Sequence, residues 1–225
     1  MLQFIKPDYK VNEYVENNYY GKFVLEPLER GFGATIGNAL RRVMLSSLEG
    51  SAITDIKIDG VMHEFQKIDG VVEDVTEIIL NVKNIAAKLF CDGPKTVILE
   101  ADGECVLTAG DIKPDAEVEI KNPELHIATL NKDAKFYMEI VFDHGIGYVP
   151  SELNKTPALP VGAIAVDSIY TPVEKVNYYV ENTRVGQNTD FDKLTVEVWT
   201  NGTKTADEAI SLSAKIINDH MMLFI

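Results

Sequence analysis

The acidic run Asn188–Asp192 is the part of the chain that most suggests catalysis, because it reads NTDFD. Clustered carboxylates hold Mg²⁺ in sites that transfer phosphoryl or nucleotidyl groups. Here the run supplies only two acids, Asp190 and Asp192, and Lys193 follows directly, before a strand-like pattern begins. We therefore interpret the run as a turn between two strands, without catalytic residues and without a metal site.

A second candidate is the glycine-punctuated loop that contains Gly31, Gly33 and Gly37. Dinucleotide-binding loops have the spacing G-x-G-x-x-G between a parallel strand and a helix. In this chain the third glycine comes one residue late, and no clear parallel strand unit surrounds it. The glycines more simply permit a tight turn into a helix. A cytosolic enzyme that binds a dinucleotide here remains the alternative function, and titration with nicotinamide and flavin nucleotides would test it.

The third candidate is the pair of adjacent arginines, Arg41 and Arg42, in the helix pattern that follows the loop. At 100° per residue one broad side of this helix is apolar, and the opposite side is polar except for one leucine. Arginine has a planar fork of five donors that suits carboxylates at a protein interface or phosphates. Two interpretations stay open: a docking face for another protein, or a solvated face with ion pairs to nearby glutamates. The apolar side holds Ile36, Ala39, Leu40, Val43 and Met44, the polar side holds Asn38, Arg41, Arg42 and Leu45, and the glutamates are Glu26, Glu29 and Glu49.

The other side chains that could carry chemistry form no recognisable motif. No two of the four histidines have i, i+4 spacing, none lies near a cysteine, and Cys91 and Cys105 form no Cys-x-x-Cys pair. The sequence therefore predicts no metal, no cofactor and no catalytic residue.

Composition limits the class of protein. The 225 residues suit one large domain or two small ones, and 46% hydrophobic residues are ample for a core. The formal net charge of −14 argues against direct non-specific binding to nucleic acid, which needs clustered Lys and Arg. The N-terminal residues do not resemble a signal peptide, and no apolar run approaches the ~20 residues that span a bilayer. We expect a cytoplasmic protein with reduced cysteines and no membrane contact.

The order of predicted elements favours an α+β fold. Helical periodicity predicts helices at 35–48, with Thr35 as N-cap, at 71–82, and at 205–225, where Thr205 and Glu208 have capping-box spacing. Alternating or β-rich patterns predict strands at 53–58, 95–100, 117–121, 136–142, 176–180 and 194–198, and the proline-rich segment 150–162 predicts a loop.

The last predicted helix is apolar over an unusually wide arc. Ala209, Ile210, Ile217, Met221 and Phe224 share one face, and further apolar residues near the chain end widen it. A helix of this kind must bury both flanks. We favour a second protein surface over the chain's own core as the cover.

Four stretches of the chain, in order, resemble the alpha subunit of bacterial DNA-dependent RNA polymerase. They are LERGFGATIGNALRRVMLSS (28–47), IDGVMHEFQKIDGVVEDVTEIILNVK (58–83), GIGYVP (145–150) and VDSIYTPVEKVNYYVENTRVGQNTDFDKLTVEVWTNGT (166–203). The resemblance covers nearly the whole chain. It implies an assembly scaffold in transcription, with the nucleotidyltransferase chemistry located in the large subunits of the polymerase.

The resemblance also implies a domain organisation. Residues 1–50 and 172–225 would form one discontinuous dimerisation domain, with helices packed on an antiparallel sheet. Residues 51–171 would form an inserted β-rich domain. The family's C-terminal DNA-binding domain is expected to lie beyond these residues, because the sequence ends on the apolar run MMLFI.

Partners and site residues follow from the same resemblance. The chain would form a homodimer and dock the beta and beta-prime subunits, with omega and sigma in the larger complex and DNA reached only through that complex. Docking of beta is expected at Asn38, Arg41, Arg42 and Leu45, docking of beta-prime at Lys83 and Val166, and dimerisation at Phe32, Ile36, Val43, Ile217, Met221 and Phe224.

Overall fold

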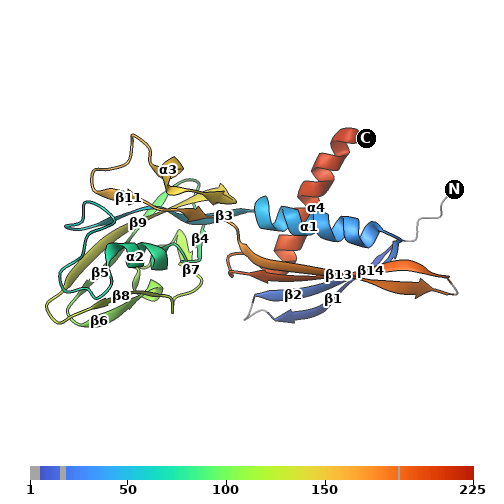
Figure 1. Cartoon of the computed structure of the whole chain (residues 1–225), viewed down its shortest axis with the longest axis horizontal. Coiled ribbons are helices and arrows are strands. Elements are labelled where there is room, and N and C mark those ends of the chain that lie inside the picture. Colours follow the sequence, from blue (N-terminus) through green and yellow to red (C-terminus); the bar gives the residue numbers. More distant parts are fainter. Residues whose placement is uncertain (1–5, 16–18, 187) are drawn as a thin grey trace. The chain divides into compact units, whose positions relative to one another are not determined.

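The computed structural model describes residues 6–15, 19–186 and 188–225, and it divides the chain into two compact units. Unit 1 comprises the residues up to Leu48 and from Thr171 onward, and unit 2 is the continuous segment Glu49–Tyr170. Figure 1 colours the chain from blue to red, so unit 1 combines the blue and the red ends. The helices and mostly antiparallel sheets confirm the predicted α+β class.

Unit 1 is built on a four-stranded antiparallel sheet with the order β1-β2-β14-β13. The two ends of the chain meet in the middle of this sheet, since the C-terminal strand β14 pairs with the N-terminal strand β2 on one side and with β13 on the other. Leu194, Val196 and Val198 alternate along β14 and point into the core. The strands are β1 (Asp8–Val15), β2 (Tyr20–Glu29), β13 (Val173–Val185) and β14 (Asn188–Thr200).

Two helices cover this sheet. Helix α1 (Phe32–Ser46) packs on β13 and β14, and α4 (Ala206–Met221) contacts α1 and continues into the short 3-10 turn η3 (Met222–Phe224). The predicted capping box of α4 is present: the Thr205 side chain accepts from the Glu208 N–H, and the Glu208 carboxylate accepts from the Thr205 N–H. Residues from both ends of the chain share one apolar core: Phe23, Leu28, Leu40, Met44, Leu48, Val173, Val176, Leu194, Val196, Val198, Ala206, Ala209 and Ile210.

Two predictions in this unit were wrong. Thr35 is not the N-cap of α1, because the helix begins three residues earlier and Gly31 holds the cap position. Residues 188–192 are not a turn, because they form the first part of β14 and pair with β13. The reversal comes just before them, where Gly186 has a φ of 62°.

Unit 2 has its own sheet and its own core. A four-stranded antiparallel sheet has the order β11-β3-β9-β5, and three further strand pairs, β4-β7, β6-β8 and β10-β12, surround it. Its strands are β3 (Glu49–Ile58), β4 (Ala87–Leu89), β5 (Lys95–Asp102), β6 (Cys105–Thr108), β7 (Val118–Ile120), β8 (His126–Leu130), β9 (Lys135–Ile146), β10 (Tyr148–Val149), β11 (Ala163–Ala165) and β12 (Ser168–Ile169). Its helical turns are α2 (Val75–Val82), η2 (Ala109–Asp111) and α3 (Ser151–Asn154).

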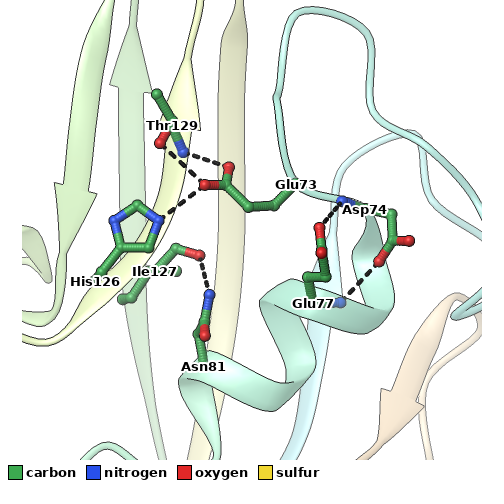
Figure 2. Close-up of polar contacts among 7 residues, drawn as sticks. All are labelled: Glu73, Asp74, Glu77, Asn81, His126, Ile127 and Thr129. Carbon is green, nitrogen blue, oxygen red and sulfur yellow. Dashed lines mark hydrogen bonds and ion pairs between the residues drawn. The ribbon is translucent and has the colours of Figure 1, made fainter.

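Helix α2 begins later than the sequence predicted, and Figure 2 shows why. The Asp74 carboxylate accepts from the Glu77 N–H at 2.8 Å, and the Glu77 carboxylate accepts from the Asp74 N–H at 3.2 Å, which closes a capping box. Upstream of this cap, Val71 forms a β-bridge with Leu130 instead of a helical turn. Val71, which the apolar spacing had placed in the helix, therefore contacts a strand instead.

Within the described part of the chain, none of the helices combines the length and the apolar character that crossing a membrane requires.

Candidate functional site

The site begins at the N-terminus of α1, where Asp192 supplies the cap. The first N–H groups of a helix have no partner within the helix. Gly31, the N-cap residue, has no side chain to offer and adopts a left-handed φ of 89°. The Asp192 Oδ2 atom instead accepts from the Gly31 N–H at 2.8 Å and from the Gly33 N–H at 3.1 Å. A strand from the other end of the sequence thus fixes the start of α1.

Glycines on the inner side of α1 let the helix lie close to the sheet. A Cβ atom added to Gly33 would lie 2.8 Å from Val180 Cγ1, and one added to Gly37 would lie 2.6 Å from the ring of Tyr178. Both distances are too short for real contacts, so the close approach of α1 to the sheet requires glycine at both positions. Because this side of α1 faces the strands, the residues on the opposite side face outward.

The outward side of α1 carries the predicted arginines. Asn38, Arg41 and Arg42 are exposed, and neither guanidinium group has a hydrogen bond or ion pair with the residues that the structure describes. In this structure the alternative of ion pairs with Glu26, Glu29 or Glu49 is therefore not realised. Leu45 differs from the sequence expectation, because it is half-buried and packs against the core of unit 1.

An apolar groove of about 680 Å³ lies beside this helix, between α1, α4 and the first two strands. Four of the predicted dimer residues line it: Phe32, Ile36, Ile217 and Met221. Its floor includes Phe23, with Tyr9 stacked on it at a centroid distance of 6.0 Å. Burial, followed by the nearby Asp207 carboxylate, raises the pKa of Tyr9 to about 12, so the phenol stays neutral. Val43 is half-buried and does not line the groove.

The C-terminal half of α4 continues this apolar surface. Figure 1 shows α4 crossing α1 and carrying the chain end clear of the sheet. The first half of the helix is buried through Ala206, Ala209 and Ile210, whereas Met221 is 56% exposed and Phe224 is 86% exposed. Exposed apolar side chains in such a run mark an interaction surface more often than a solvated face.

The two predicted beta-prime residues lie in unit 2 and differ in exposure. Lys83 is the half-buried C-cap residue of α2. Val166 is only 1% exposed and belongs to the apolar core of the unit. The neighbouring GIGYVP segment presents Tyr148, whose pKa is raised by burial and by Asp167. A contribution of Val166 to docking would therefore act through the loop around it.

The geometry argues against the dinucleotide alternative. The strands on either side of α1, β2 and β3, belong to different antiparallel sheets and form no parallel unit. A pyrophosphate would bind at the N-terminus of the helix, where the Asp192 carboxylate already accepts the N–H groups. Gly31 serves the turn into the helix, and Gly33 and Gly37 serve close packing.

Two residues in this region have roles that the sequence did not predict: Tyr9, which lines the apolar groove, and Asp192, which caps α1. The alternation of Tyr9 and Val11 with Asp8, Lys10 and Asn12 is a strand signal that would have located β1. Asp192 had no such signal, because its partners lie about 160 positions away.

Comparison with known proteins first defines the class. Residues 56–171 match the model of the RNA polymerase Rpb3/RpoA insert domain, which covers most of unit 2 and ends at its junction with unit 1. The match identifies unit 2 as the insert domain of an RNA polymerase subunit.

Full-length similarity then defines the family. The chain is 58% identical over 224 residues to the DNA-directed RNA polymerase subunit alpha of Alkaliphilus oremlandii, and 59% identical over 224 residues to that of Clostridium perfringens strain 13. It is 56% identical over 225 residues to that of Symbiobacterium thermophilum. Each alignment covers 100% of this chain and 71% of the relative. The chain belongs to the family of bacterial DNA-directed RNA polymerase alpha subunits.

Proposed function

We propose that this chain is the assembly scaffold of its RNA polymerase: two copies pair through unit 1, and the pair then docks the beta and beta-prime subunits. Unit 1, close to residues 1–50 plus 172–225, is the dimerisation and assembly domain in this proposal, and unit 2, close to 51–171, is the insert. Omega and sigma join the larger complex, which works in the cytoplasm and reaches DNA through its other parts.

The observation that carries the proposal is the outward side of α1. Asn38, Arg41 and Arg42 project from a helix that is seated on a sheet, and the guanidinium groups have no partner among the described residues. Arginines with planar, multivalent donors are enriched among the residues that dominate protein interfaces. Leu45 adds a partly exposed apolar contact beside them. These four residues form the proposed beta-docking face.

The apolar groove supports self-association. It opens beside the exposed end of α4, so the groove and the helix end of one copy offer matching apolar surface to a second copy. A twofold pair buries the same patch on both copies, and a self-complementary apolar patch suits that symmetry. Phe32, Ile36, Val43, Ile217, Met221 and Phe224 belong to the proposed dimer interface.

Lys83 and Val166 mark the proposed beta-prime contact. Lys83 is the half-buried C-cap residue of α2, and Val166 supports the segment next to Tyr148 and Asp167 from inside. The half-buried Lys83 therefore contacts the partner, and the buried Val166 holds the shape of the contact.

Affinity purification from a bacterial lysate tests the proposal, with the tagged chain as wild type and as Arg42→Ala. We expect the wild type to recover the beta and beta-prime subunits. Arg42→Ala should lose beta while folding and self-association persist, because an exposed side chain is removed and no core contact changes. Binding should fall by at least about tenfold, as for a central interface arginine.

Arg184→Ala is the matched control, because Arg184 is exposed on β13 and outside every surface proposed here. It should recover both large subunits as the wild type does. A wild-type chain that recovers neither subunit would refute the scaffold role, and a monomeric or unfolded Arg42→Ala protein would refute the assignment of Arg42.

A further inference from the structure

Helix α1 obtains its cap in a different way from the other two long helices. Helices α2 and α4 each begin with a capping box made by two residues three positions apart, Asp74 with Glu77 and Thr205 with Glu208. Helix α1 has no acidic residue in its first turn and no side-chain cap of its own. Its cap is the Asp192 carboxylate on β14. A local cap stabilises a helix wherever it lies, whereas a cap on a strand also fixes where the helix lies.

Asp192 is built into the contact between helix and sheet. It is only 6% exposed, and it stands on the same face of β14 as Leu194, which packs against Gly37 one turn further along α1. A buried carboxylate needs full compensation. Two N–H donors at the positive end of the helix dipole supply it here.

The spacing of the contact leaves no room for adjustment. A Cβ atom on Gly33 would lie 3.0 Å from the Asp192 Oδ2 atom, so the carboxylate reaches the helix only because residue 33 is a glycine. One turn later, a Cβ atom added to Gly37 would lie 2.6 Å from the Tyr178 ring and 2.9 Å from Leu194 Cδ1. The helix is therefore fixed at two successive turns, first by a polar contact and then by packing.

The fixed end sets the position of the exposed end. Because each helical residue adds about 1.5 Å, Arg42 lies about 15 Å along the axis from the first residue of α1, and a tilt of about 10° would displace it by about 3 Å. A displacement of that size breaks the short, directional hydrogen bonds that a guanidinium group makes. Phe32 and Ile36, which line the apolar groove, would move with the helix.

We propose that Asp192 is a positioning residue for docking: its carboxylate fixes α1 on the sheet and thereby aims Arg41 and Arg42 at the beta subunit. This inference rests on the proposed function. The inference assigns a role in docking to a residue that does not itself touch the partner and that lies about 150 positions after the arginines in the sequence.

The test is the affinity of the whole chain for the purified beta subunit, with stability measured in parallel. Asp192→Ala removes the cap, and Asp192→Asn keeps one oxygen that can accept both N–H groups. Val198→Ala is the matched control, because it removes a buried side chain from the same strand without touching α1's cap. We expect Asp192→Ala to weaken binding at least about tenfold, and Asp192→Asn and Val198→Ala to stay within about threefold of the wild type.

A double-mutant cycle separates positioning from general destabilisation. Arg42→Lys provides the second background, since it loses the planar fork yet leaves a charge and a measurable affinity. If Asp192 acts through Arg42, Asp192→Ala should have much less effect in the Arg42→Lys background than in the wild type. Additive losses, or a loss in Asp192→Ala no larger than in Val198→Ala, would overturn the inference.

A second variant covers the case in which Asp192→Ala does not fold. Gly33→Ala leaves the carboxylate in place and adds a Cβ atom that pushes the helix away from it. We expect a folded protein with weakened docking, and wild-type affinity in Gly33→Ala would overturn the inference. A wild-type chain that does not bind beta at all refutes the proposed function, which is a different result from wild-type binding that survives the loss of Asp192.

Discussion

Glu73 shows how one side chain can join two parts of unit 2. Its carboxylate accepts from the Thr129 hydroxyl at 3.0 Å, from the Thr129 N–H at 2.6 Å, and lies 2.8 Å from the His126 ring (Figure 2). At the other end of α2, the Asn81 amide donates to the Ile127 carbonyl at 3.0 Å. The helix and the segment before it are thus attached to β8 by polar groups at two points.

The ionised form of Glu73 is the stabilising form. Burial by itself would raise the pKa of Glu73, but the hydrogen bonds from Thr129 and His126 outweigh it, and the pKa lies below the usual 4.5. A carboxyl group with a lowered pKa in the folded state adds stability above its unfolded pKa and loses it as the pH falls through the folded value. The contribution of Glu73 is therefore present at neutral pH and is lost progressively as the pH falls below about 4.5.

Glu73→Gln should lower the free energy of unfolding by about 1–3 kcal/mol at pH 7, because charge-assisted hydrogen bonds are lost. Urea denaturation at a series of pH values checks this. The difference between wild type and variant should shrink as the pH falls below 4.5. The control Glu124→Gln, at an exposed position, should change the free energy of unfolding at pH 7 by no more than about 0.5 kcal/mol. A gap between wild type and Glu73→Gln that widens on acidification would contradict the assigned role.

Helix α4 has two halves with different surroundings. Its first half is buried in unit 1, and its second half projects apolar side chains beside the groove. Ile217, at the boundary, is half-buried and packs against the core of the unit while it lines the groove. This division explains the wide apolar arc in the sequence.

Ile217→Asp should dissociate the proposed dimer, because pairing would bury an unpaired carboxylate. Analytical ultracentrifugation over a range of concentrations measures the shift to monomer, which we expect to exceed about tenfold in dissociation constant. Lys215→Asp, on the exposed side of the same helix, should remain a dimer. The assigned interface would be wrong if Ile217→Asp pairs as tightly as the wild type.

Local signals predicted whole elements well and their partners poorly. The capping box at Thr205 and the alternation in 194–198 were sufficient for α4 and β14, because those signals depend on neighbouring residues. The start of α1 was misplaced at Thr35, since the deciding contact comes from Asp192. The arginine face was predicted from periodicity, but the half-burial of Leu45 depends on core residues that are distant in sequence.

At the scale of the whole chain, unit 2 interrupts unit 1. Each unit has an apolar core of its own. The two places where the chain leaves and re-enters unit 1 are adjacent, since the Thr171 hydroxyl donates to the Leu45 carbonyl at 3.3 Å. Unit 2 is continuous in sequence, whereas unit 1 needs both ends of the chain.

The segment Glu49–Tyr170 should fold when it is expressed alone, because its core and its strand pairs lie within it. Urea denaturation should show one cooperative transition, and an amide NMR spectrum should be well dispersed. A fragment of residues 171–225, which lacks β2 and α1, should remain unfolded. An unfolded Glu49–Tyr170 fragment would show that the insert depends on unit 1.

The link between Gly31 and Asp192 also has a consequence for protein synthesis. The two residues are 161 positions apart, so at about 5–20 residues per second a ribosome needs roughly 8–30 s to make the second after the first. For most of that interval the nascent chain contains both arginines while α1 lacks its cap. A chain that ends before Asp192 lacks the carboxylate that caps α1. The cap of α1 is therefore acquired late in synthesis, once translation has passed Asp192.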